Sequence, residues 1–130
     1  DYRATLDRFV ALEAFGSDHA KEEIRELRAE LFARGEPAAR ILIDGLRILE
    51  STDQRPLLAR LRVPSVWIAG RRDRLVDPRA MRDTVAMIEQ AGHAPATFAQ
   101  IEHAGHAPFL THVDEVVAQL TPFLSGSVAQ

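Results

Sequence analysis

Two histidines three residues apart, His103 and His106, lie in the glycine-containing segment HAGHAPF near the end of the chain. Histidines in such a segment fit three roles: metal ligands, a catalytic base, or side chains of a surface loop. A metal site needs three or four converging ligands. His93, His103, His106 and His112 do not have the spacing of a zinc site, and the chain contains no cysteine. We therefore expect neither a metal nor an organic cofactor, and we treat the pair as holding a candidate base.

A carboxylate that could orient such a base is Asp73, in the polar segment RRDRLVDP after the apolar run SVWIAG. That run, and the run ATFAQI before the histidines, have the composition of buried strands. Asp73 and His106 are 33 residues apart, which leaves room for one crossover helix between adjacent parallel strands. Since function in α/β sheets lies beyond the carboxyl ends of strands, we expect the two side chains to meet. Such a pair belongs to a nucleophile–histidine–acid triad.

Asp77 is an alternative to Asp73 as the acid. It precedes Pro78, and proline is favoured in the first turn of a helix. Apolar residues at helical spacing continue from Pro78 to about Ala91, so we expect a helix there with Asp77 as its N-cap. Asp73 is then the residue left to face a histidine.

The order of elements indicates an α/β protein. Residues 1–50 have the apolar periodicity of three short, charged helices, and residues 111–124 that of a last helix. Between them the order is strand, loop, helix, strand, loop, which predicts parallel strands with crossover helices. Because two parallel strands do not form a stable sheet alone, we expect further strands from elsewhere. An open sheet edge would also permit self-association.

Composition limits the classes of function. The 130 residues fit one modest domain, with 46% hydrophobic and 27% charged residues. The formal net charge of −3 gives no basic footprint for nucleic acid. No apolar run reaches the roughly 18 residues of a membrane span, and no signal peptide opens the sequence. A cytoplasmic protein is the expectation.

The two loops resemble the C-terminal part of the α/β-hydrolases. That family has a strand, G-x-x-D-x-(L/I)-V, a helix, a strand, G-H-x-P and a closing helix. The matching positions are Gly70, Asp73 and Val76 in the first loop, and Gly105, His106 and Pro108 in the second. The resemblance implies a fragment of an α/β-hydrolase, with a helical cap over residues 1–55 followed by the last two parallel strands and helices of the core over residues 56–130. It also implies that Asp73 and His106 are catalytic, with His106 rather than His103 as the base.

The helical stretch from Leu6 to Pro64 resembles, more narrowly, the cap of the pimeloyl-[acyl-carrier protein] methyl ester esterases of biotin biosynthesis. The segments RFVAL, GLRIL, TDQR and HAPF carry this likeness. The resemblance implies that the cap offers basic residues to an acidic acyl-carrier protein, here Arg8, Lys21 and Arg25, and that Phe9 lies near the substrate channel. On the residues alone, Phe9 is most simply a helix-packing residue, and a charged helix of this kind is usually a solvated face.

One element of the family pattern is missing. None of the serines Ser17, Ser51, Ser65, Ser125 and Ser127 lies in a G-x-S-x-G nucleophile elbow. We expect the nucleophile and the oxyanion donors in an N-terminal half of the core outside this sequence, and we expect this chain alone to be inactive. Two alternatives stay open: another capped α/β-hydrolase, such as a lactonase or a C–C bond hydrolase, and a non-catalytic carrier-binding module.

Overall fold

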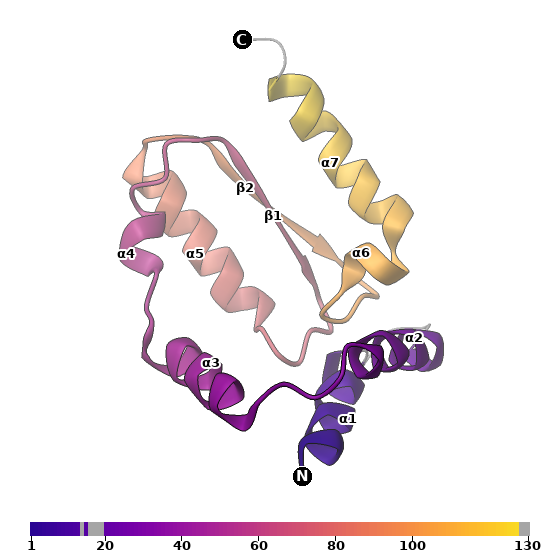
Figure 1. Ribbon diagram of the computed structural model, residues 1–130. Coiled ribbons are helices and arrows are strands. Elements are labelled where there is room, and N and C mark those ends of the chain that lie inside the picture. Colours follow the sequence, from indigo (N-terminus) through magenta and orange to yellow (C-terminus); the bar gives the residue numbers. More distant parts are fainter. Residues whose placement is uncertain (14, 16–19, 128–130) are drawn as a thin grey trace.

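The computed structural model describes residues 1–13, 15 and 20–127 (Figure 1). The elements in chain order are α1 (Tyr2–Glu13), α2 (Ala20–Ala33), α3 (Ala39–Ser51), α4 (Arg55–Leu58), β1 (Ser65–Gly70), α5 (Pro78–Ala91), β2 (Ala96–Ile101), α6 (Pro108–Thr111) and α7 (Val113–Ser127). The three helices expected over residues 1–50 are confirmed. The short helices α4 and α6 were not predicted, because four residues are too few to show a hydrophobic period.

Strands β1 and β2 pair in parallel, with Ser65 opposite Ala96 and Gly70 opposite Ile101. The prediction of parallel strands joined by a crossover helix is therefore confirmed, and α5 is that helix. Within the described residues the sheet contains only these two strands. Both strands end at the same edge, so the loops that follow them start side by side.

The two faces of the sheet are covered by different helices (Figure 1). On one face, Val85 and Ile88 of α5 pack against Ala96, with Trp67 and Phe98 beside them. On the other face, Val116 of α7 packs with Ile101 and Ala104, and Ile68 and Leu120 complete the cluster. Residues one apart on a strand thus face different helices, as the pleat requires. Burial on both faces is what a parallel sheet needs.

Helix α5 has a defined start and stop. The side chain of Asp77 accepts a hydrogen bond from the Arg79 N–H at 2.9 Å, and Pro78 occupies the first turn. Gly92 ends the helix in the left-handed conformation, with φ of 70°, and its N–H donates to the Glu89 carbonyl. The prediction that Asp77 is an N-cap is confirmed.

Helices α1 and α2 pack against each other, beyond the carboxyl ends of the strands (Figure 1). Val10 of α1 is buried. Arg28 Nε lies 3.0 Å from Asp7 Oδ1, and the guanidinium groups of Arg3 and Arg28 lie over the Phe32 ring. Exposed ion pairs of this kind contribute little stability, so the apolar contact is the main one.

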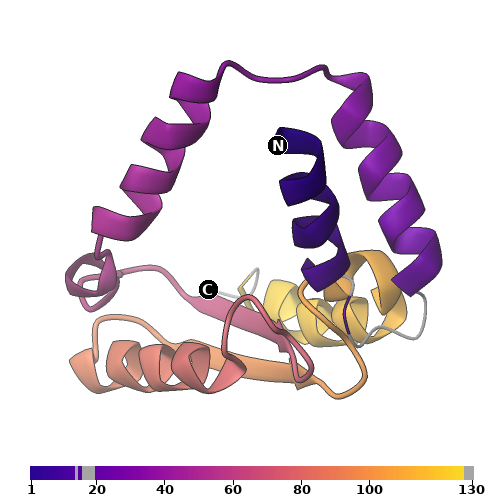
Figure 2. The same ribbon diagram turned by 90° about the horizontal axis from the view of Figure 1, so that it is seen from below.

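Helix α3 lies apart from this pair (Figure 2). It has no buried residue, and Leu46 and Leu49 are 65% and 79% exposed. Within the described part of the chain, nothing covers this apolar face. Among the same residues, no helix combines the length and the apolar character that crossing a membrane requires.

Gly70, at the end of β1, permits a close approach of the backbone of Ala104 and Gly105. A Cβ atom at this position would lie 2.0 Å from the Gly105 carbonyl oxygen and 2.5 Å from that of Ala104. These are backbone atoms of the loop between β2 and α6, residues 102–107, which is called the histidine loop. Backbone atoms cannot rotate away as a side chain would. Only glycine lets this loop pass directly over the end of β1.

Gly70→Ala is expected to destabilise the protein by about 1–3 kcal/mol, because the added methyl group overpacks a backbone contact. The free energy of unfolding from chemical denaturation measures this. Gly45→Ala is the matched control, since Gly45 lies within α3 with open space around it and alanine is favoured in helices by about 0.5–1 kcal/mol. Equal stability of the Gly70→Ala variant and the parent would contradict the close approach.

Candidate active site

Asp73 and His106 meet at the carboxyl ends of the two strands. His106 Nδ1 lies 2.9 Å from Asp73 Oδ2. The Asp73 side chain is 5% exposed, whereas that of His106 is 33% exposed. The carboxylate is therefore shielded, while the ring still reaches solvent. The expectation that the two side chains meet is confirmed, and Asp77 lies outside the pair as the cap of α5.

The backbone of its own loop fixes the Asp73 carboxylate. Oδ1 accepts hydrogen bonds from the N–H groups of Leu75 at 2.8 Å and Val76 at 2.9 Å. The second oxygen is left for His106. Because an ionised carboxylate only accepts hydrogen bonds, this contact places the proton of a neutral ring on Nδ1. The Nε2 lone pair is then available as a base.

Backbone hydrogen bonds hold the two loops together. The Arg71 N–H donates to the Ile101 carbonyl at 2.9 Å, and the Arg72 N–H donates to the Ala104 carbonyl at 3.0 Å. Both bonds start in the loop between β1 and α5, residues 71–77, which is called the acid loop. They end at the last residue of β2 and in the histidine loop. Ala104 is fully buried under the contact with Gly70. The distance between the acid and the base is thus set by main-chain atoms.

Side chains also cross between the loops, and one of them belongs to His103. His103 Nδ1 lies 3.1 Å from an Arg72 guanidinium nitrogen, and Arg71 Nε lies 2.9 Å from a carboxylate oxygen of Glu102. His103 is exposed and contacts a cation rather than a carboxylate. Of the two histidines, only His106 is oriented by an acid.

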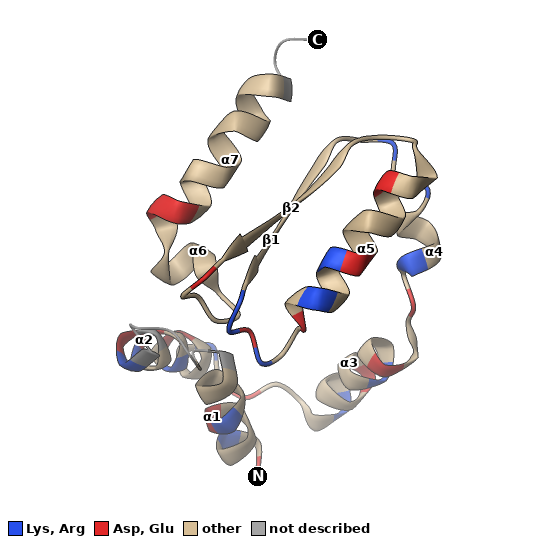
Figure 3. Cartoon of the chain, turned by 180° about the vertical axis from the view of Figure 1, so that it is seen from behind, with Lys and Arg blue, Asp and Glu red and all other residues tan. Residues whose placement is uncertain are grey.

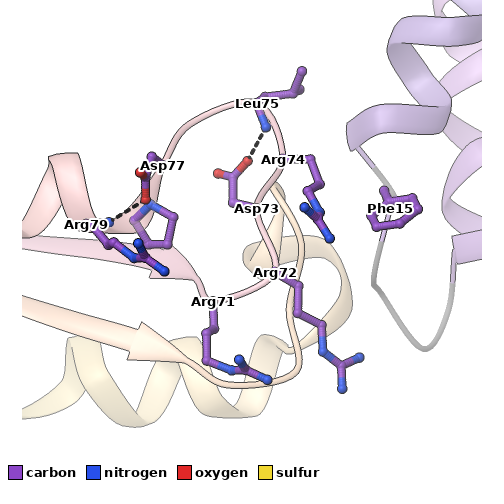
Figure 4. Close-up of a pocket in the computed structure, with 9 residues that line it drawn as sticks. Phe15, Arg71, Arg72, Asp73, Arg74, Leu75, Asp77 and Arg79 are labelled. Atoms are coloured by element: carbon purple, nitrogen blue, oxygen red, sulfur yellow. Dashed lines mark hydrogen bonds between the residues drawn. The ribbon is translucent and has the colours of Figure 1, made fainter.

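An open cleft of about 760 Å³ lies beside Asp73 (Figure 4). Its lining consists of Phe15, Arg71, Arg72, Asp73, Arg74, Leu75, Asp77, Pro78 and Arg79. Phe15 comes from the segment between α1 and α2, and the Arg74 guanidinium lies 5.1 Å from the centre of its ring. The helical segment therefore contributes one wall of the cleft. Neither Phe15 nor Arg74 was predicted as a site residue, although the run RRDR already concentrates arginine next to Asp73.

The four residues predicted to bind substrate or carrier lie on α1 and α2. Arg8, Lys21 and Arg25 are exposed, and within the described residues none of them forms an ion pair. Phe9 is 44% exposed, next to the buried Val10. None of the four is among the described residues that line the cleft. The structure thus leaves the three cations accessible but does not bring them to Asp73.

Across residues 1–13, 15 and 20–127, no three His, Asp or Glu side chains converge on one point. The histidine that the acid holds donates from Nδ1, and its partner carboxylate already accepts two backbone hydrogen bonds. What the arrangement can do chemically is hold one imidazole in a fixed tautomer with its second nitrogen free.

An acid and a histidine that follow successive parallel strands, under a helical segment, define the C-terminal part of an α/β-hydrolase. The elements of this chain fit the C-terminal part of that class, and the chain is similar over nearly its whole length to curated proteins of the class. Within the class, its relatives are named pimeloyl-[acyl-carrier protein] methyl ester esterase.

Three of these relatives show the extent of the likeness. The chain is 52% identical over 134 residues to the protein of that name from Stenotrophomonas maltophilia (strain R551-3), covering 97% of this chain and 47% of the relative. It is 54% identical to that of Xanthomonas campestris pv. campestris (strain B100) and 50% identical to that of Xanthomonas oryzae pv. oryzae (strain MAFF 311018), each over 96% of this chain and 47% of the relative. The chain therefore spans about half the length of the curated relatives it matches. No protein-family model matches it.

Asp77→Ala is expected to lower the free energy of unfolding by about 1 kcal/mol, because α5 loses its N-cap hydrogen bond. Chemical denaturation measures the loss, and Asp77→Asn, which keeps an acceptor oxygen, is the control with a smaller effect. A variant that unfolds at the same denaturant concentration as the parent would show that the cap contributes nothing.

Proposed function

We propose that this chain supplies the acid and the base of a serine carboxylesterase that hydrolyses the methyl ester of pimeloyl-[acyl-carrier protein] in biotin biosynthesis. The observation that carries the proposal is the Asp73–His106 hydrogen bond at the ends of adjoining parallel strands. The names of relatives that are 50–54% identical over nearly the whole chain support the substrate.

The proposed chemistry is acyl transfer through a serine that lies outside this sequence. His106 Nε2 removes the proton of the serine hydroxyl as its oxygen attacks the ester carbonyl, and the resulting imidazolium gives that proton to the departing methoxide. Water, activated by the same nitrogen, then releases the free acid. Asp73 stabilises the imidazolium and keeps the ring in place, and it stays ionised throughout.

The described geometry suits these roles. A carboxylate whose first oxygen accepts two backbone N–H groups cannot turn away from the histidine. Its low exposure limits competition by water for the second oxygen. The greater exposure of His106 leaves a path for a nucleophile and a substrate. We also propose that the protein acts in the cytoplasm, where an acyl-carrier protein would deliver the ester.

The helical segment is proposed to select the substrate. Arg8, Lys21 and Arg25 lie exposed on α1 and α2, where cations can meet an acidic carrier protein, and Phe9 is exposed enough to contact an acyl chain. The uncovered apolar face of α3 and the second edge of β1 are proposed to pack against the part of the core that holds the serine. This chain together with that part of the core is called the intact protein.

Asp73→Asn in the intact protein is expected to lower kcat for a methyl ester by about 10³–10⁴-fold. The asparagine either keeps its oxygen as the acceptor for the Leu75 and Val76 N–H groups and presents its NH₂ group to His106, or it turns over and loses both of these contacts. The wrong tautomer then has no free base at Nε2. Steady-state hydrolysis measures the effect, and Asp77→Asn is the control, with kcat within about twofold of the parent.

Substrate profiling separates the esterase from its alternatives. The proposal expects cleavage of methyl pimeloyl-carrier protein and of short methyl esters, and labelling of the intact protein by a serine-directed fluorophosphonate. Cleavage of a ring-fission diketone or of a lactone, with methyl esters ignored, would contradict it in favour of another hydrolase. Absence of labelling would favour a non-catalytic module.

A further inference from the structure

The basic residues of the second half of the chain are confined to one stretch. All seven arginines after residue 55 lie between residues 60 and 82, and this half contains no lysine. Four of them, Arg71, Arg72, Arg74 and Arg79, line the cleft beside Asp73. Figure 3 shows basic segments in the loop after β1 and in the first turn of α5. The chain as a whole has a formal net charge of −3, so this positive charge is local.

The carboxylates near the cleft are occupied. Asp73 holds His106 and two backbone N–H groups, and Asp77 accepts the Arg79 backbone N–H. Glu102 pairs with Arg71. Each of these carboxylates has a partner other than the guanidinium groups of Arg74 and Arg79.

Arg74 and Arg79 are exposed, and within the described residues neither forms an ion pair. The Arg74 guanidinium lies over the Phe15 ring (Figure 4). Stacking on an aromatic face keeps the charge and leaves the N–H edge of the group free to donate. The contact therefore holds Arg74 in the cleft without neutralising it.

We propose that the guanidinium groups of Arg74 and Arg79 form a second interaction surface for the acidic carrier protein, on the strand-end loops of the core. This inference rests on the proposed function and adds a contact that is separate from Arg8, Lys21 and Arg25 on the cap helices. We call it the acid-loop surface. A carrier held by both surfaces would span the entrance to the cleft, and its acyl group would be held next to the Asp73–His106 pair.

Charge favours a small acidic protein over nucleic acid as the occupant. A nucleic-acid strand needs a basic track along its whole contact, whereas residues 1–55, which contribute Phe15 to the cleft, hold more acidic than basic residues. The guanidinium groups of Arg74, beside Phe15, and of Arg79, at the start of α5, form no ion pair within the described residues and match a few carboxylates on a compact partner. Arginine is the side chain best suited to bind carboxylates in pairs.

Binding of pimeloyl-carrier protein to the intact protein tests the acid-loop surface. This ligand is the reaction product, so it is not consumed, and fluorescence anisotropy of a labelled carrier gives its Kd. The double variant Arg74→Gln/Arg79→Gln is expected to raise Kd by about tenfold and to weaken its dependence on salt. Arg79→Gln alone, which leaves the Phe15 contact intact, is expected to raise Kd by about threefold.

The matched control is Arg60→Gln/Arg62→Gln. These two exposed arginines precede β1, at the opposite end of the strands, and their replacement changes the net charge by the same amount. The Kd of this control variant for pimeloyl-carrier protein is expected to stay within about twofold of that of the parent. An equal weakening in both double variants would overturn the proposal, because it would reduce the effect to net charge. An unchanged Kd for the Arg74/Arg79 variant would overturn it as well.

Hydrolysis separates this surface from the proposed function. The Arg74/Arg79 variant is expected to lose kcat/KM for methyl pimeloyl-carrier protein about tenfold, through KM, while kcat/KM for a small dimethyl ester stays within about twofold. A parallel loss on both substrates would mean damage to the catalytic pair and would overturn the surface. Failure of the parent to cleave the carrier-bound ester would overturn the proposed function, whereas the binding comparison would still decide on the surface.

Discussion

The hydrogen bond between His106 and Asp73 exists only because two strand ends are held against each other. Its geometry depends on main-chain contacts: Arg71 and Arg72 donate backbone N–H groups to carbonyls at the end of β2 and in the histidine loop, and Gly70 has no side chain where that loop passes. These backbone contacts order both loops, so the acid and the base lose less conformational entropy when they meet than they would on two free loops. Asp73 is 5% exposed without being unpaired, because its oxygens accept hydrogen bonds from Leu75, Val76 and His106.

The two parts of the chain differ in how they are held. Around the sheet, Ile88 and Ile101 are fully buried, on opposite faces. In the helical segment, Val10 is the one large apolar side chain that is fully buried among the described residues, and α3 has none. Hydrophobic burial is the main source of stability. The strand-end loops are therefore placed by a packed core, whereas α3 keeps an apolar surface for which a partner is required.

Sequence patterns predicted the elements that carry the site. The strands at residues 65–70 and 96–101, the helix from Pro78 to Ala91 and the N-cap at Asp77 follow from local rules on composition, proline and capping. The short α4 and α6 were missed because their hydrogen bonds, rather than any apolar period, define them. Helix α7 begins at Val113 rather than at Thr111, since Thr111 is the last residue of α6 and His112 is the C-cap of α6.

By themselves, the residues of this chain determined which acid and which base are present, their separation along the chain, and the absence of a G-x-S-x-G motif within it. These follow from residue types and local order, which a sequence contains directly. The tertiary structure alone decided that His103 turns to Arg72, that Phe15 reaches Arg74, and that Arg8, Lys21 and Arg25 stay away from the cleft. Each of these depends on contacts between residues far apart in sequence, and such contacts are fixed by the packing of whole elements rather than by any local pattern.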